Sequence, residues 1–206
     1  MTQPETRVTT GLVRVSYEHL FHPTKRSDDL DAAPKYSAVL LIPKADTRTI
    51  AAIKTAIEKA VLKGVQEKWN GKRPAVVSTT FHDGDLPRPS DGESYGDECK
   101  GMMVLNVSAT EKYPPRIIDN HKQQILDESQ IYSGVWGMAN IDFYAYAHKS
   151  GKKGISCGIN IFMKLKDDTP LGGAPVNVDE AFGNGYEIDP ITGELTAIGA
   201  DNAVPS

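Results

Sequence analysis

The sequence predicts a mainly β fold: a small five-stranded Greek-key barrel with one inserted α-helix and an acidic C-terminal tail. Three observations lead to this prediction. Short segments rich in β-branched or alternating apolar residues recur along the chain, one segment near position 50 changes to a helical period, and the last forty residues contain no lysine or arginine. Strands and helices do not alternate regularly, which disfavours a doubly wound parallel sheet, and an α+β sandwich is the alternative.

Two strands are expected before the helix. Residues 8–17 are rich in β-branched side chains, and residues 35–42 form a second apolar run that stops at Pro43. The polar segment 18–33 is expected to form the loop that joins them.

A helix is expected over residues 47–70. From Ile50 to Trp69, apolar residues recur at spacings of three and four, which is the period of an amphipathic helix. Asp46 is the expected N-cap, and Asn70-Gly71 is the expected end.

The second half of the chain completes the barrel. Its expected elements are a turn-rich loop at 82–98, a strand at 101–109, a short edge segment at 114–119, and a strand pair at 135–147 and 154–166. About five strands with one helix among them are most economically arranged as a Greek-key barrel of the OB type.

Charge divides the chain into two parts. Residues 1–166 contain all 23 basic residues and 19 acidic ones, whereas residues 167–206 contain eight acidic residues and no basic one. We therefore expect an OB-like domain over 1–166 and an acidic, Gly- and Pro-containing tail over 167–206, in which 186–198 is able to form a hairpin. A basic body with an acidic tail suggests a cationic surface and an anionic competitor for it, and a solubilising segment is the alternative.

Cysteine use and hydropathy limit the environment of the protein. Cys99 and Cys157 are too few for a disulfide scaffold or a cysteine zinc site, and they fit a reducing cytoplasm. No apolar run approaches the length of a membrane span, and the N-terminus lacks the basic-then-apolar order of a signal peptide. We expect neither export nor membrane insertion.

The final strand pair carries the most informative pattern. If the loop closes symmetrically about Gly151, alternation places the apolar side chains of both strands on one face. The opposite face then presents aromatic and basic residues: Tyr144, Tyr146, Phe162, Lys164 and Lys166, with Lys149, Lys152 and Lys153 at the tip. Rings interleaved with lysines suit single-stranded nucleic acid, because bases stack on rings at ~1–3 kcal/mol each and ammonium groups neutralise phosphates. The alternative is that these rings pack beneath a loop or the helix.

Other residues are weaker candidates for the same surface. Arg14 and Arg116 are further phosphate-binding candidates, and Tyr36, Tyr113, Tyr132 and Trp136 are further stacking candidates.

Sequence patterns typical of catalysis are weak. The acidic loop 82–98 is rich in Gly and Pro, whereas a two-metal nuclease holds its carboxylates on rigid elements. No nucleophile motif, phosphate loop or histidine metal spacing is present. We expect no enzyme activity, metal or cofactor; a metal-dependent nuclease using Asp83 and Asp85 is one alternative.

Seven short stretches carry a resemblance to a known family. In order, they are Tyr36 to Pro43 (YSAVLLIP), Asp83-Gly84-Asp85, Tyr95-Gly96, Asn106 to Asp119 (NVSATEKYPPRIID), Ile131 to Tyr146 (IYSGVWGMANIDFYAY), Gly154 to Asn160 (GISCGIN) and Pro170 to Gly173 (PLGG). Together they resemble a family of tailed-phage single-stranded DNA-binding proteins, formerly catalogued as a domain of unknown function.

The resemblance implies an OB-fold, sequence-independent binding of single-stranded DNA, and a role in phage DNA replication or recombination in the cytoplasm of the infected bacterial host. It implies neither metal nor reaction. Phage replication or recombination proteins are candidate partners, and self-association is a further candidate. It also supports the acidic tail as a competitor of DNA for the basic groove.

One feature departs from this class. Such tails often finish in an acidic run closed by an aromatic residue, whereas this chain ends in Val204-Pro205-Ser206, and its tail aromatics, Phe182 and Tyr186, lie well inside. Docking of partners through the extreme C-terminus is therefore in question, whereas competition with DNA requires only charge. A phage protein-interaction module without DNA contact is the second hypothesis.

Overall fold

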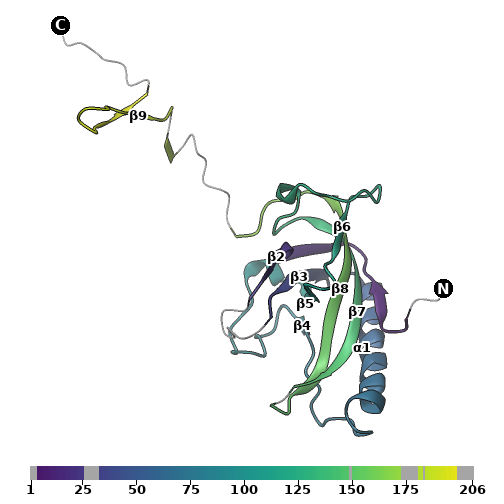
Figure 1. Cartoon of the computed structure of the whole chain (residues 1–206). Helices are drawn as coiled ribbons and strands as arrows, with labels where there is room; N and C mark the ends of the chain where they lie inside the picture. The colour runs from purple at the N-terminus through teal and green to yellow at the C-terminus, as the bar shows by residue number, and fades with distance from the viewer. Residues whose placement is uncertain (1–3, 26–32, 149, 173–180, 183, 199–206) are drawn as a thin grey trace. The chain divides into compact units, whose positions relative to one another are not determined.

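The computed structural model describes residues 4–25, 33–148, 150–172, 181–182 and 184–198, and it divides after Gly172 into two compact units (Figure 1). The smaller unit contains a two-stranded antiparallel hairpin of β9 (Tyr186–Ile188) and β10 (Leu195–Ala197). This confirms the hairpin foreseen within 186–198. Residues 167–172, which the charge pattern assigns to the tail, belong to the larger unit.

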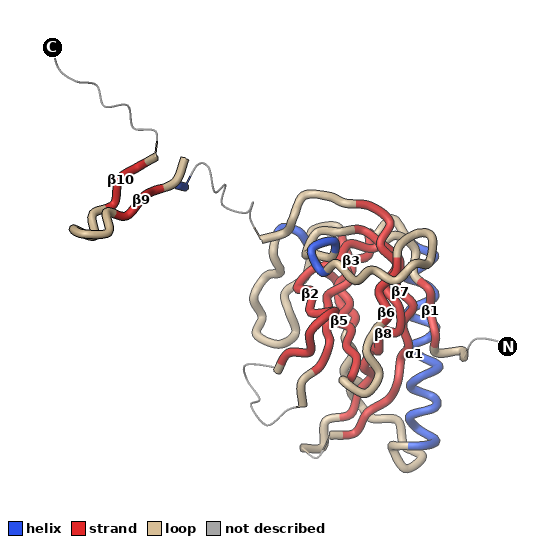
Figure 2. Tube along the Cα trace, turned by 45° about the horizontal axis from the view of Figure 1, so that its top comes forward, coloured by secondary structure: helices blue, strands red, loops and turns tan. Residues whose placement is uncertain are grey.

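Five strands of the larger unit close a barrel (Figure 2). In ring order they are β2 (Val13–Thr24), β3 (Lys35–Pro43), β5 (Met102–Thr110), β8 (Lys153–Lys166) and β7 (Trp136–Ala147). Each strand pairs with the next, and β7 pairs again with β2. All these pairings are antiparallel except β5–β8. This strand order is compatible with the Greek-key barrel of the OB type that the sequence predicts.

Short elements extend this ring. β1 (Arg7–Thr9), β4 (Phe81–Asp83) and β6 (Arg116–Ile118) pair with β7, β5 and β8 respectively. β6 confirms the edge segment expected at 114–119. Two single-turn 3₁₀ helices, η1 (Asp97–Cys99) and η2 (Glu128–Gln130), lie in the loops.

The helix α1 (Thr47–Glu67) begins and ends close to the predicted positions. The Asp46 carboxylate accepts a hydrogen bond from the Thr49 backbone N–H at 3.0 Å, and the chain turns away at Asn70, whose φ is 55°. The apolar side of α1 joins the barrel core through Ile53, Ala56, Ala60 and Val61. Among the described residues, no helix combines the length and hydrophobicity needed to cross a bilayer.

The first strand differs from its prediction. The segment 8–17 is interrupted after Thr9, and β2 continues to Thr24 through a region expected to be a loop. Pairing of Thr24 with Lys35 on β3 and burial of Leu20 stabilise the extension. These are tertiary contacts, which local polarity does not reveal.

The register of β7 and β8 corrects the prediction for Phe162. Near the loop the strands pair about Ser150 rather than Gly151, a shift of two residues that keeps the predicted faces. Farther along, Ile141 pairs with Ile159 but Asn140 pairs with Ile161, so Asn160 is an extra residue in β8. This bulge exchanges the two faces beyond it. Phe162 is consequently fully buried, and its prediction as an exposed stacking ring is wrong.

Replacing this ring tests the corrected register. Phe162→Ala should lower the free energy of unfolding by ~3–5 kcal/mol, because it opens a cavity in the core. Tyr144→Ala, at a side chain that is 44% exposed, is the matched control and should cost far less. Urea denaturation of both variants measures the difference. Equal, small losses would contradict the burial of Phe162.

Candidate nucleic-acid interface

A groove crosses the outer face of the barrel over β3 and β5. It consists of two adjoining hollows of about 860 and 510 Å³, which share Val39 from β3 and Asn106 from β5. The floor is built by strand alternation: Leu40 and Leu105 point into the core, whereas Val39 and Asn106 face outward. In oligonucleotide-binding barrels, this face and the loops beside it contact the strand.

Aromatic and basic side chains line the larger hollow. Tyr17 comes from β2, Tyr95 and Arg88 from the loop before η1, Tyr146 from the end of β7, and Lys152 from the β7–β8 loop. Arg88 forms an exposed ion pair with Asp91, at 3.1 Å. Lys152 has no ion-pair partner among the described residues, so its charge is available to a ligand.

Of these five aromatic and basic residues, the sequence predicts Tyr146 and Lys152 as DNA-binding residues. It does not predict Tyr17, Tyr95 or Arg88. None of these three sits in an interleaved aromatic and basic pattern, so strand alternation could not single them out. The one available signal was Tyr95-Gly96, which is among the stretches that carry the family resemblance.

The smaller hollow is polar. Ser37, Ser108 and Ser156 line it together with Lys35, which stands at the end of β3 opposite Thr110. Thr80 also lines this hollow, and its own hydroxyl is buried without a hydrogen-bond partner among the described residues. Hydroxyls of this kind can donate to, or accept from, a base or a phosphate.

A small apolar cluster supports the larger hollow from beneath. Leu41, Cys99 and Val104 are buried there, and Val39 and Tyr95 pack against them. Burial raises the pKa of the Cys99 thiol to about 11, so this cysteine is neutral and acts as a packing residue. Burial also lowers the pKa of His82, which lines the hollow, so its imidazole adds no positive charge near neutral pH.

Five of the residues predicted to bind DNA form a second group, apart from the groove: Arg14, Tyr132, Trp136, Lys164 and Lys166. The segment 167–171, here called the strap, crosses them. The Trp136 indole N–H donates to the Asp168 carboxylate at 2.7 Å, and the Tyr132 hydroxyl donates to Asp167 at 2.9 Å. Lys164 forms an ion pair with Asp167 at 2.8 Å. The strap therefore occupies the polar groups of this cluster.

The arginine and the end of the strap complete these contacts. Arg14 donates to the backbone carbonyl of Thr169 at 2.6 Å, and both Arg14 and Lys166 lie over the Trp136 ring. Leu171 packs against the apolar cluster of Leu41, Cys99 and Val104. The strap thus ends beside the groove.

The predicted residues are divided between two places on the final strand pair. Trp136 and Tyr146 are ten residues apart on β7, which is about 33 Å at ~3.3 Å per residue. Tyr146 lines the groove at one end, whereas Trp136 lies under the strap at the other. One short stretch of DNA does not contact both ends as a single surface.

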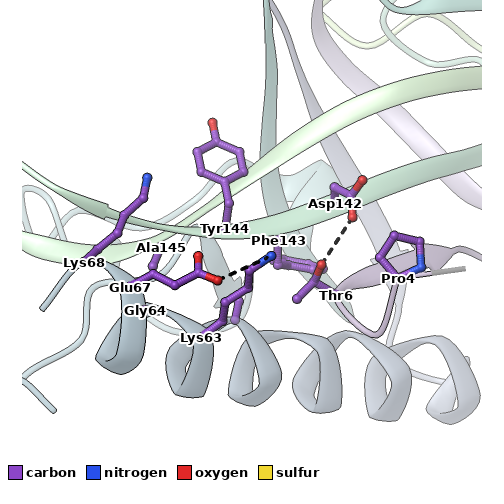
Figure 3. A pocket seen from close by; sticks show the side chains of 11 residues that line it. Pro4, Thr6, Lys63, Gly64, Glu67, Lys68, Asp142, Phe143, Tyr144 and Ala145 are labelled. Atoms are coloured by element: carbon purple, nitrogen blue, oxygen red, sulfur yellow. Dashed lines mark hydrogen bonds and ion pairs between the residues drawn. The ribbon is translucent and has the colours of Figure 1, made fainter. Parts of the chain in front are cut away.

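Tyr144 and Lys153 lie near the groove end of the pair. Tyr144 is among the residues that line a cavity of about 440 Å³ between α1 and β7, and its ring points away from α1 (Figure 3). It lies against Gly158, opposite the face that the helix covers. Lys153 starts β8 and is half-buried. Lys149 lies outside the described residues.

The remaining candidates are dispersed. Tyr36 shares its strand face with the buried Ala38 and Leu40, so its placement on the groove face is not supported by the fold. Tyr113 is exposed in the turn after β5, and Arg116 is exposed on β6. These two side chains remain predictions.

Two carboxylates of the acidic loop form ion pairs with a lysine of the protein itself. Lys44 forms ion pairs with both Asp83 and Asp85, and hydrogen bonding to its ammonium group lowers the pKa of each carboxyl. Among the described residues, no group of three or more acidic, histidine or cysteine side chains is arranged to hold a metal ion. The carboxylates are therefore engaged in an ion pair that ties this loop to the end of β3.

Known proteins resemble this chain in sequence and in fold. A family model described as the single-stranded DNA-binding protein of Enterobacter phage Enc34 matches residues 6–191. A putative protein, p50, of Acyrthosiphon pisum secondary endosymbiont phage 1 is 30% identical over 82% of this chain and 88% of its own length.

Solved structures show the same fold. The single-stranded DNA-binding protein of bacteriophage Enc34, in complex with single-stranded DNA, is 26% identical, with a TM-score of 0.64 over 84% of this chain and 97% of that chain. The single-stranded DNA-binding protein gp2.5 of bacteriophage T7 is 15% identical, with a TM-score of 0.56 over 83% of this chain and 98% of its own, and shares the fold. Because the family match spans most of the sequence, the chain belongs to the family of phage single-stranded DNA-binding proteins represented by that of Enc34.

Proposed function

We propose that this protein binds single-stranded DNA in the groove over β3 and β5, without regard to sequence, during phage DNA replication or recombination in the host cytoplasm. The observation that carries the proposal is the joint placement of Tyr95, Tyr146, Arg88 and Lys152 around one hollow on the binding face of an OB barrel. The complex of the Enc34 relative with single-stranded DNA supports it. The protein acts by binding, without a catalysed reaction.

The groove chemistry favours single strands. Bases that are free of a duplex can stack on Tyr95 and Tyr146, whereas the paired bases of a duplex cannot reach these rings. Arg88 and Lys152 neutralise phosphates at the rim. The polar hollow that includes Ser37 and Ser108 then supplies hydrogen bonds to the continuing strand. None of these contacts requires a particular base.

The tail is the proposed competitor of DNA. Residues 173–206 contain six acidic and no basic residues. Leu171 packs the end of the strap against the apolar cluster of Leu41, Cys99 and Val104, which lies beneath the larger hollow, and the acidic segment follows directly in the chain. A polyanion attached at this point has a high effective concentration and competes with DNA for the same positive field.

Separate substitutions should distinguish stacking from charge. Tyr146→Ala should weaken binding of a poly-dT oligonucleotide by about 5- to 150-fold with an unchanged salt slope, because it removes ~1–3 kcal/mol of stacking and no charge. Lys152→Ala should reduce the salt slope by about 0.7, the value for one phosphate. Lys54→Ala, exposed on α1, is the charge-matched control. Fluorescence anisotropy at several salt concentrations measures all three, and a loss of salt slope in Tyr146→Ala would count against stacking.

Neutralising the tail should strengthen binding. Replacing its six carboxylates from residue 173 onward by amides removes the competitor without removing the hairpin, so affinity for the oligonucleotide should rise at low salt. The gain should disappear as salt screens the charges. Ile191→Ala, at an apolar side chain that is 93% exposed, should leave affinity unchanged. Equal affinity of the amide variant and the parent at low salt would exclude competition.

The strap should titrate in acid. The Trp136 N–H holds the pKa of Asp168 below its usual value, and the Lys164 ammonium does the same for Asp167. The stability that each of these two contacts contributes is fully present above the unfolded carboxyl pKa of about 3.9. It is lost as pH falls through the lower pKa of the folded state. Trp136 emission should therefore change below about pH 4, and Asp168→Asn should abolish this change. Trp69 is buried and bonded to a backbone carbonyl, so it gives a constant background. A transition retained in Asp168→Asn would disprove the assignment.

A further inference from the structure

Tyr17 occupies a backbone position that normally belongs to glycine. Its φ is 45°, in the left-handed region, where a bulky side chain is a conformational outlier. The cause is a bulge in β2: between the pairs Ser16–Val39 and His19–Ser37, β2 contains two residues and β3 contains one. In bulges with a left-handed first residue, glycine usually fills that place. Here the chain retains a tyrosine.

Within the described part of the chain, the ring of Tyr17 has no bonding partner. Its side chain is 69% exposed, and it forms no hydrogen bond, ion pair or ring contact among the described residues. Tyr17 nevertheless lines the larger hollow together with Tyr95 and Tyr146. A strained, exposed aromatic residue without a structural partner is unfavourable for stability alone.

We propose that the bulge presents Tyr17 as a base-stacking platform on the β2 side of the groove, and that the protein accepts backbone strain to hold it there. The inference rests on the proposed function and extends it by naming a binding residue that strand alternation does not find. In a regular strand, the ring would follow the alternation of β2. The extra residue instead turns it outward toward the groove, which is a recognised role of bulges beside binding sites.

This proposal predicts opposite effects on stability and binding. Tyr17→Gly relieves the left-handed strain, so its Tm should equal or exceed that of the parent. The same variant lacks the ring, so binding of the poly-dT oligonucleotide should weaken by about 5- to 150-fold with an unchanged salt slope. Tyr17→Phe should retain binding. A merely structural ring would lower Tm when removed.

A backbone-matched control is available. Asn70 also has a left-handed backbone, with a φ of 55°, and it follows α1 without lining either hollow of the groove. Asn70→Gly should therefore leave oligonucleotide affinity unchanged. Tyr17→Trp provides a direct signal, because a base stacked on the new indole should quench its emission when the oligonucleotide binds.

The outcomes separate this inference from the function beneath it. If the parent protein binds no oligonucleotide, the proposed function fails. If the parent binds and Tyr17→Gly binds equally well, or if Tyr17→Trp shows no quenching, only the assignment of Tyr17 fails. A lower Tm in Tyr17→Gly would overturn the claim that strain is retained for binding. Weaker binding at an equal or higher Tm, with quenching at position 17, would support it.

Discussion

Closure of the five-stranded ring is the constraint on which the other features of the structure depend. β7 pairs with β2 on one side and with β8 on the other, and β8 pairs with β5 in parallel. Each of the five ring strands therefore has a neighbour on both sides. Strands in so small a barrel must bend and tilt strongly, and extra residues in β2 and β8 provide local bends. Each extra residue also reverses which side chains face the core. The bulge at Asn160 therefore buries Phe162, and the bulge at Tyr17 exposes a ring.

The groove arises from the two faces of β3 and β5. Their inward side chains, such as Leu40 and Leu105, belong to the main core, and their outward side chains form the groove floor. A second apolar cluster beneath the acidic loop makes that floor rigid, and the Lys44 ion pairs fix the base of the loop to β3. Rings and cations at the rim therefore stand on a supported surface, which reduces the conformational entropy lost when a flexible strand binds.

The groove and the strap differ in how their cations are engaged. The cations nearest the strap are already paired, since Lys164 contacts Asp167 and Arg14 contacts the strap backbone. Lys152 and Lys35 remain without ion-pair partners among the described residues. At the groove, Arg88 is paired with Asp91, whereas the ammonium group of Lys152 is open to a ligand. The strap thus engages part of the basic surface, and its last residue packs against the apolar cluster beneath the groove.

Local information in the sequence determined the elements: the Asp46 cap and apolar period of α1, the strand pair ending the body, and the opposite charges of body and tail. It also singled out Tyr146 and Lys152, which both line the larger hollow. Only the tertiary structure decided the rest, because faces and neighbours depend on pairing between distant strands. The bulges at Tyr17 and Asn160 arise from register across the barrel, so alternation misassigned Phe162 and did not find Tyr17. Barrel closure also places Tyr95 beside the same hollow as Tyr146 and leaves Trp136 at the other end of β7. Spacing along the sequence does not reveal these neighbours.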